Sequence, residues 1–225
     1  MARQVLIVAA HPDDEVLGCG GVASRHAKSG DRVTSLIVAE GATSRGEAQA
    51  GEGAALQGAA RAAAETLGAQ PPRFGGLRDN RLDSVALLDV VKLIEETAAE
   101  IRPEIVYTHH AGDLNIDHQI VARAVATAFR PLPGAGPRAL YAFETVSSTE
   151  WAEPSEGGSF LPSHFVDISD TLDTKLAALR CYESEMRDFP HPRSHEAVEA
   201  LARLRGATAG LKAAEAFAVI REVVA

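Results

Sequence analysis

The chain has 225 residues, of which 46% are hydrophobic and 24% charged, a composition typical of a folded globular domain rather than of a disordered segment. Its 31 acidic and 22 basic side chains give a formal net charge of −9. This balance argues against a nucleic-acid binder and against electrostatic attachment to a membrane, because both need a basic face. With no apolar stretch of about 20 residues and only two cysteines, we expect one domain over residues 1–225 and a cytoplasmic location.

Short apolar runs alternate with amphipathic stretches in the first part of the chain. The continuous run at 5–10 predicts a strand buried on both faces of a parallel sheet. Gly30 is expected to end the helix that follows this strand. The same reasoning predicts further strands at 32–39, 74–77, 105–108, 139–144 and 165–168, the last at a sheet edge, and helices over 15–28, in an alanine-rich stretch ending at 67–68, and over 84–101 and 119–129. Strands alternating with helices predict an α/β domain whose largely parallel sheet is flanked by helices.

The pattern becomes less regular beyond residue 130. Residues 151–162 are predicted to form an irregular lid or rim loop. Asp170 is expected to cap a helix running to about Glu185, and a last helical stretch is predicted from Ser194 to the C-terminus, interrupted near Gly206 and Gly210. The alanine-rich helices could pack in the core or against a second copy, so a homo-oligomer stays open.

A histidine and three acidic residues directly follow the first predicted strand, at positions 11–15. Ligands of open α/β sheets bind beyond the carboxyl ends of the strands, which is where these side chains begin. His11 and Asp14 are three residues apart across a proline that stiffens the turn, so they can converge on one metal ion. Nitrogen plus carboxylate oxygen suits Zn²⁺. Asp13 is then close enough to accept a proton from a water activated by the metal.

A second polar loop, at 109–118, follows the strand that ends at Thr108. If the two strands are near neighbours, this loop meets the first one at the same sheet edge. His118 is the predicted third ligand because it lies at the start of a helix, and it leaves a fourth position open for water or substrate. Asp117 is a candidate for a residue that does not bind the metal itself but hydrogen-bonds to a ligand side chain and fixes its orientation.

Two other interpretations stay open. Residues Gly18–Ala23 match G-x-G-x-x-A, a variant of the dinucleotide fingerprint, although the acidic turn before them would repel a pyrophosphate. The glycines are more simply explained by close packing of the helix backbone. The second alternative is a metal-binding module without catalysis, which leaves the additional carboxylate of Asp13 unexplained.

The segment Ala10-His-Pro-Asp-Asp-Glu15 after an apolar strand, followed by Leu17-Gly-Cys-Gly-Gly21, resembles the signature of the PIG-L/LmbE family of zinc-dependent N-deacetylases. The later Asp113-Leu-Asn-Ile-Asp-His118 is similar to that family's second motif, and segments 182–185, 189–194 and 214–217 also resemble bacterial members. The resemblance implies a Rossmann-like, LmbE-like fold. It also implies a metal-dependent hydrolase that removes an acyl group, usually acetyl, from a small N-acyl amino sugar or sugar conjugate.

The resemblance further implies roles for individual residues. His11, Asp14 and His118 would bind zinc, and Asp13 would be the general base; Fe²⁺, Mn²⁺ or Co²⁺ would also suit this ligand set. Many members carry a histidine three residues before the last ligand that stabilises the oxyanion, and this chain has Asn115 there. We therefore expect Asn115, or His109 or His110 from the same loop, to take that role, and of the two histidines we favour His110.

The resemblance also concerns substrate contacts. Many members carry an arginine early in the helix after the second strand, and the corresponding stretch 54–57 of this chain has none. Arg45, Arg81 and Arg193 are the candidates to bind substrate in its place.

Overall fold

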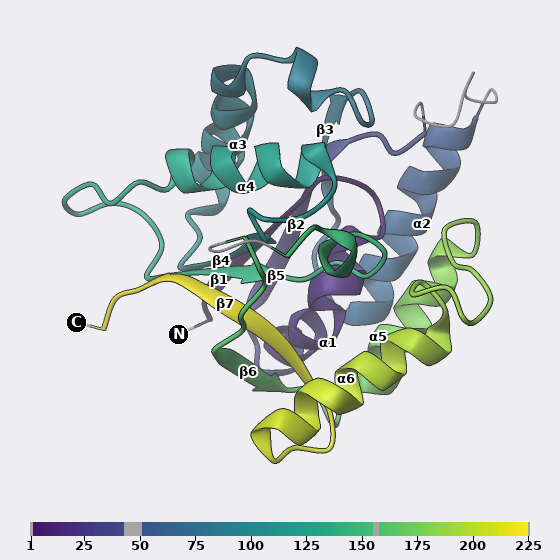
Figure 1. Ribbon diagram of the computed structural model, residues 1–225. Helices are drawn as coiled ribbons and strands as arrows, with labels where there is room; N and C mark the ends of the chain where they lie inside the picture. The colour runs from purple at the N-terminus through teal and green to yellow at the C-terminus, as the bar shows by residue number, and fades with distance from the viewer. Residues whose placement is uncertain (1, 43–50, 155–157, 225) are drawn as a thin grey trace.

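The computed structural model describes residues 2–42, 51–154 and 158–224, which form a seven-stranded sheet with helices on both faces (Figure 1). The strands are β1 Gln4–Ala9, β2 Arg32–Ala39, β3 Arg73–Leu77, β4 Ile105–His109, β5 Ala139–Phe143, β6 His164–Asp167 and β7 Ala214–Glu222. The helices are α1 Asp14–Lys28, α2 Glu52–Leu67, α3 Leu87–Ile101, α4 Ile116–Ala128, α5 Leu172–Leu179 and α6 His195–Ala209, with single 3₁₀ turns η1 Leu82–Ser84, η2 Thr149–Trp151 and η3 Arg180–Tyr182.

The strand order is β3-β2-β1-β4-β5-β7-β6. Strand β1 pairs in parallel with β2 and β4, β2 with β3, and β4 with β5. Strand β7 runs antiparallel to both β5 and β6, so six strands share one direction and β7 alone is reversed. The predicted α/β class with a mostly parallel sheet flanked by helices is confirmed.

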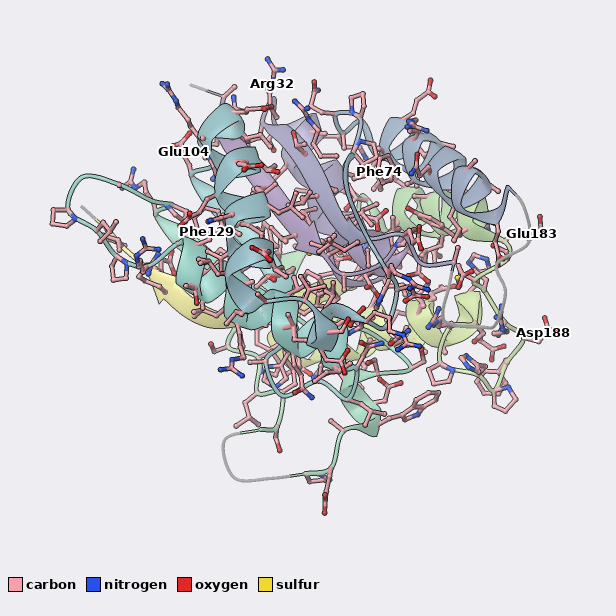
Figure 2. The ribbon with its side chains drawn as sticks, turned by 90° about the horizontal axis from the view of Figure 1, so that it is seen from above. Arg32, Phe74, Glu104, Phe129, Glu183 and Asp188 are labelled. Carbon is pink, nitrogen blue, oxygen red and sulfur yellow. The ribbon has the colours of Figure 1, made fainter. Side chains whose placement is uncertain are left out.

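Strand β1 explains why the sheet carries helices on both faces. Successive side chains of a strand point to opposite faces. Val5 and Ile7 pack in a core with α1, α2 and α5, whereas Leu6 and Val8 pack in another with α3 and α4, and none of the four is more than 1% exposed. The helix layers lie on opposite sides of the sheet (Figures 1 and 2). No helix among the residues described here is long and apolar enough to cross a membrane.

The C-terminal part corrects the sequence analysis. The helix predicted from Ser194 onward ends at Ala209, where Gly210 adopts φ +74°, and residues Ala214–Glu222 form β7 instead. Their alanine and glutamate content favours a helix, but β7 is paired along both edges and buries Phe217 completely. Tertiary pairing therefore overrides local propensity.

The predicted helix beginning at Asp170 is also corrected. Helix α5 begins at Leu172, with Thr171 at the N-cap position, and it ends at Leu179 rather than near Glu185. A 3₁₀ turn, η3, follows directly and carries the chain on to Tyr182.

The glycines of the dinucleotide-like pattern lie inside α1 and serve packing. A Cβ on Gly18 would overlap the ring of Phe143, and one on Gly21 would lie 2.8 Å from side-chain carbons of Ile168. Because residues 18–23 are buried against neighbouring elements, no phosphate group can reach their amides. The nucleotide-cofactor alternative is therefore wrong for this segment.

The sheet order places one crevice at the point where the topology reverses. From β1 the sheet extends through β2 and β3 on one side and through β4 and β5 on the other. The loops after β1 and β4 therefore diverge at their shared carboxyl edge, the usual ligand position in open α/β sheets. Both polar loops singled out in the sequence lie there.

Candidate metal centre

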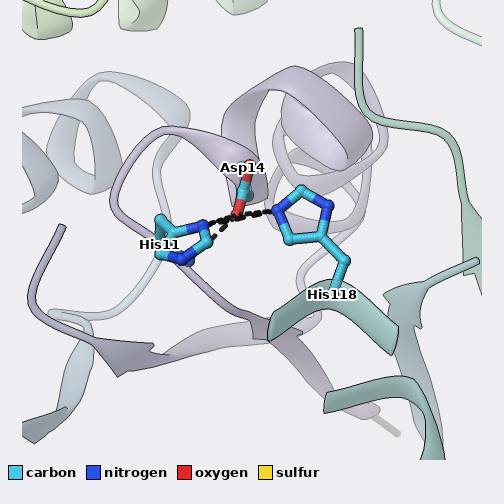
Figure 3. Close-up of side chains that lie close together, drawn as sticks. All are labelled: His11, Asp14 and His118. Carbon is cyan, nitrogen blue, oxygen red and sulfur yellow. Dashed lines mark hydrogen bonds and ion pairs between the residues drawn. The ribbon is translucent and has the colours of Figure 1, made fainter. Parts of the chain in front are cut away.

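Three side chains meet at this switch point. His11 comes from the loop after β1, Asp14 from the first turn of α1, and His118 from the first turn of α4 (Figure 3). Asp14 Oδ2 lies 3.3 Å from His11 Nδ1 and 3.2 Å from His118 Nε2, and the two ring nitrogens are 3.3 Å apart. The structure thus brings together the three residues that the sequence predicted as metal ligands.

The spacing of these three atoms suits a tetrahedral metal ion. Tetrahedral bonds of about 2.0–2.1 Å place neighbouring ligand atoms about 3.3 Å apart, close to the separations found here. Two imidazole nitrogens and one carboxylate oxygen are a donor set that Zn²⁺ accepts, with one position left open. The residues present therefore fit the ion that the resemblance implies.

The remaining nitrogen of each histidine faces a carboxylate. Asp113 Oδ1 lies 3.1 Å from His118 Nδ1, and His11 Nε2 lies 3.1 Å from both Asp117 Oδ2 and Asp79 Oδ1. Such contacts fix the ring and its tautomer for metal binding. Sequence reasoning singled out Asp117 but missed Asp113, although Asp113 lies in the same His- and Asp-rich loop. It also missed Asp79, which follows β3 and has no local signal.

Asp117 is itself fixed from two sides. Its Oδ2 accepts the backbone N–H of Asn80 at 2.8 Å, and its Oδ1 accepts that of Leu82 at 3.0 Å. The side chain is completely buried. Asp117 therefore connects the segment after β3 to the His11 ring. It contacts Nε2 of His11, the ring nitrogen that does not face Asp14, which is compatible with its predicted role in orienting a ligand.

The buried charges of the centre shift one another's pKa values. Burial alone would raise the pKa of Asp14, but the neighbouring His118 charge and the hydrogen bond with His11 hold it well below its usual range. Burial opposes protonation of His118, yet Asp14 and Asp113 raise its pKa to about 9. A cation is thus favoured here even without a metal, as expected for a site built to hold positive charge.

Asp13 occupies the N-cap position of α1 and is 2% exposed. Its Oδ2 lies 3.0 Å from Arg193 Nη1. Burial and the neighbouring Asp14 charge raise the pKa of Asp13 well above its usual range, while Arg193 opposes the rise. A raised pKa makes the carboxyl group a better proton acceptor than an ordinary aspartate, as a general base requires.

A cleft of about 500 Å³ opens over these residues. This volume is in the range of small-molecule sites. Four carboxylates line it, against one guanidinium, that of Arg193, among the described lining residues. The lining consists of His11, Pro12, Asp13, Asp14, Gly41, Asp79, Asn80, Asn115, His118, Thr145, Val146, Ser147, Ser148, Glu185 and Arg193.

Asn115, a predicted oxyanion residue, lines the cleft and also caps α4. Its Oδ1 accepts the backbone N–H of Asp117 at 2.8 Å, and its Nδ2 donates to Asn80 Oδ1 at 3.2 Å. An amide nitrogen carries two hydrogens, so a second one is available for a ligand. The position of Asn115 is compatible with the predicted role.

His109, the last residue of β4, and His110 directly after it do not line the cleft. His110 lies outside the cleft lining, with Nε2 2.9 Å from the carbonyl of Gly158. Its predicted oxyanion role stays a prediction and would require that contact to break. His109 is completely buried, accepts the N–H of Ala10 at Nε2, and lies 3.2 Å from Thr145 Oγ1. Burial and the nearby His118 lower the pKa of His109 to about 3, so it stays neutral.

The structure describes two of the three arginines proposed for substrate binding, and it places them differently. Arg193 lies in the cleft, where Nε donates to Ser147 Oγ at 2.8 Å. Arg81 is exposed and outside the cleft lining. Arg45 lies outside the described residues. Arg193 is thus the arginine that the structure places beside the candidate metal ligands.

The fold and the site together define an α/β protein with a His–Asp–His candidate metal centre at its switch point. The chain belongs to the PIG-L family, because the family model described as GlcNAc-PI de-N-acetylase matches residues 6–129, more than half of its length. The resemblance stated from the motifs is confirmed.

Curated relatives include both deacetylases and a hydratase. The uncharacterized deacetylase YaiS of Escherichia coli K12 is 29% identical over 81% of this chain and 91% of its own length. The diacetylchitobiose deacetylase of Thermococcus kodakarensis is 28% identical over 81% of this chain and 70% of its own. The 4-oxalmesaconate hydratase of Pseudomonas putida KT2440 is 30% identical over 80% and 72%, respectively.

A solved structure extends the likeness over almost the whole chain. GalB, the 4-carboxy-2-hydroxymuconate hydratase from P. putida KT2440, superimposes with a TM-score of 0.81 at 25% identity, over 99% of this chain and 98% of that one. Proteins similar to this chain therefore carry more than one chemistry on one fold, so function has to be argued from the residues of the site.

Proposed function

We propose that this protein is a zinc-dependent hydrolase that removes an N-acyl group, chiefly acetyl, from a small amino sugar or sugar conjugate. The observation that carries the proposal is Asp13, a buried carboxylate beside the three candidate ligands that is not itself one of them. A site that only binds metal has no need for this group. The deacetylases among the relatives support the same reaction.

The proposed roles follow from the positions of the side chains. His11, Asp14 and His118 hold the metal, which when bound polarises the amide carbonyl and acidifies water. Asp13 takes a proton from the attacking water as its oxygen bonds to the carbonyl carbon. When the carbon–nitrogen bond breaks, Asp13 returns that proton to the leaving nitrogen. The immediate products are a carboxylic acid, acetic acid in the chief case, and the free amine of the amino sugar. At neutral pH the acid loses its remaining proton and becomes a carboxylate, and the amine takes up a proton.

Charge in the cleft favours amide hydrolysis over the hydratase alternative. The new amine becomes a cation at neutral pH, and Asp79 and Glu185 are further carboxylates in the lining. A carboxylate-bearing substrate, which the name of the hydratase GalB indicates for that protein, would instead meet like charges. Among the described lining residues, Arg193 carries the one guanidinium that could pair with such a substrate. This guanidinium already hydrogen-bonds to the Asp13 carboxylate. We therefore expect a neutral N-acetylated substrate.

Two variants test the proposal against its alternatives. Purified protein should contain about one zinc per chain by mass spectrometry, and His118→Ala should lose most of it. Asp13→Asn keeps the shape of the side chain but cannot take up the proton, so it should retain metal while acetate release from N-acetylglucosamine or diacetylchitobiose falls about 10²- to 10⁴-fold. The native metal is read from the same spectrum, since Fe²⁺, Mn²⁺ or Co²⁺ would also suit the site.

Three outcomes would contradict the proposal. Absence of metal after dialysis against Zn²⁺ would rule out the metal centre. Bound zinc without turnover of any N-acetyl sugar would indicate a binding module. Hydration of an unsaturated carboxylate, followed by its ultraviolet absorbance, would indicate the hydratase reaction. Single-domain organisation, a homo-oligomer and a cytoplasmic location stay predictions.

A further inference from the structure

The backbone of Asp13 has an unusual conformation. Its φ of 104° and ψ of −33° lie outside the usual left-handed basin, in a region where non-glycine residues are rare. Such a conformation costs free energy and persists only where neighbouring groups impose it. The peptide that precedes this residue must therefore be held by specific contacts.

A buried chain of hydrogen bonds supplies one such contact. The N–H of Asp13 donates to Glu15 Oε2 at 3.1 Å, and the hydroxyl of Tyr182 donates to Glu15 Oε1 at 2.5 Å. Tyr182 is completely buried and Glu15 is 5% exposed. Because the two oxygens of one carboxylate link the phenol to the Asp13 amide, the position of Tyr182 limits where that amide can lie.

Tyr182 reaches this position from a distant part of the chain. It belongs to η3, directly after α5, and lies beyond the residues 6–129 matched by the family model. Helix α5 packs on α1, whose N-terminus carries Asp13. The turn η3 therefore directly follows a helix that packs on α1, the helix that Asp13 caps.

We propose that Tyr182 is a positioning residue for the reaction: through Glu15 it fixes the Asp13 peptide and thereby aims the Asp13 carboxylate into the cleft. The inference rests on the role proposed above for Asp13. Arg193 holds the Asp13 carboxylate from the opposite end, with Nη1 3.0 Å from Oδ2. Tyr182 acts on the backbone and Arg193 on the side chain, so the two contacts together define one orientation.

A second buried tyrosine provides a matched control. Tyr107 on β4 is 2% exposed, and its hydroxyl makes one buried hydrogen bond, 3.1 Å from His26 Nε2. His26 lies near the C-terminal end of α1, whereas Asp13 caps the N-terminal end. Tyr107→Phe and Tyr182→Phe therefore remove the same group from similar surroundings, and of the two hydroxyls only that of Tyr182 is linked through Glu15 to the Asp13 amide.

The experiment compares the kinetics and metal content of the two variants. Tyr182→Phe should lower kcat for acetate release about 10- to 100-fold, with KM and metal content unchanged. Tyr107→Phe should keep kcat within about twofold of the wild type. Equal losses of kcat in both variants, or a loss in neither, would overturn the proposal.

Hydrogen exchange at the Asp13 amide tests the same inference without turnover. Measured by NMR, protection of this amide should fall about tenfold or more in Tyr182→Phe and stay unchanged in Tyr107→Phe. If the wild type hydrolyses no N-acetyl sugar, the proposed function fails, while unchanged protection in Tyr182→Phe would separately overturn the positioning role.

A second pair of variants keeps the test independent of Tyr182. Glu15→Gln retains an oxygen that can accept the Asp13 N–H, whereas Glu15→Leu retains none. Glu15→Gln should therefore keep more of kcat and of the amide protection than Glu15→Leu. Equal losses in both would contradict the proposal.

Discussion

Adjacent aspartates in one turn have opposite electrostatic environments. Asp14 faces His118 and His11, which hold its pKa well below the usual range against the effect of burial. Asp13 is equally buried but faces Asp14, and its pKa is raised. One carboxylate is thus kept ionised, as a metal ligand requires, and the other can exchange a proton. Environments that separate two pKa values in this way are a recurrent means of assigning acid–base roles.

Asp113 should matter for metal affinity although it is not a ligand. Burial alone would raise its pKa, but His118 and the hydroxyls of Ser148 and Thr149 lower it to about 2. Asp113→Asn removes the charge that orients and polarises His118. The zinc dissociation constant, measured by competition with a chelator, should rise about 10- to 100-fold.

Asp31→Asn is the control for that measurement. Asp31 also pairs a buried carboxylate with a histidine, its Oδ2 lying 2.7 Å from His26 Nδ1, but this pair is at the other end of α1. Zinc affinity should be unaffected in Asp31→Asn. A similar loss in both variants would show that the effect of Asp113→Asn reflects general destabilisation.

At the scale of elements, two helical glycines should respond oppositely to alanine. Gly18 in α1 lies against the buried Phe143 ring, so Gly18→Ala should destabilise the fold by about 1–3 kcal/mol. Gly58 in α2 is exposed with nothing within 4 Å of an added Cβ, so Gly58→Ala should stabilise by about 0.5–1 kcal/mol through helix propensity. Urea denaturation of both variants measures the difference. Destabilisation by Gly58→Ala would contradict the interpretation.

Elements whose burial follows from their own sequence were predictable, and β7 was not. The run at 5–10 is apolar throughout, so its strand could be read directly, and the observed β1 covers Gln4–Ala9. Residues Ala214–Glu222 have a helix-like composition, and their conformation is decided by pairing with β5 and β6. No local pattern contains that information.

The residues of the candidate site also fall into those that the local sequence predicts and those that only the tertiary structure brings together. His11 and Asp14 are three residues apart, and local spacing alone suggests their convergence. His118 could be added because two strand ends meet at one sheet edge, which required β1 and β4 to be neighbours. Asp79 follows β3 and has no local signal, whereas Tyr182 lies in η3, in a segment that resembles the family but gives no indication of a role. Their contribution depends on the tertiary arrangement.

At the scale of the whole molecule, stability should depend on a charge cluster far from the cleft. Asp31 accepts hydrogen bonds from Arg3, including one of 2.6 Å at Nη2, and also faces His26. Burial opposes ionisation, but these contacts lower the pKa of Asp31 to about 2. Because the folded-state pKa lies below the ordinary value of about 3.9, the stabilisation is complete above that value and is lost as pH falls toward 2.

The same Asp31→Asn variant measures this contribution. It should lower the free energy of unfolding by about 1–2 kcal/mol at pH 7, a figure that allows for solvent screening at the half-exposed Arg3. The difference from wild type should shrink steadily below about pH 4. A difference that stays constant down to pH 3 would contradict the assignment. Urea titrations between pH 7 and pH 3 provide the measurement.

The reversed strand β7 also constrains the order of assembly during synthesis. Chains emerge from the ribosome from the N-terminus, and β7 follows both of its sheet partners in the sequence. Before β7 is made, β6 has no neighbouring strand to pair with, and one edge of β5 is unpaired. Insertion of β7 closes that edge and recruits β6 in one event. The first five strands of the sheet order can therefore pair before β7 has been made, whereas β7 and β6 join the sheet together afterwards.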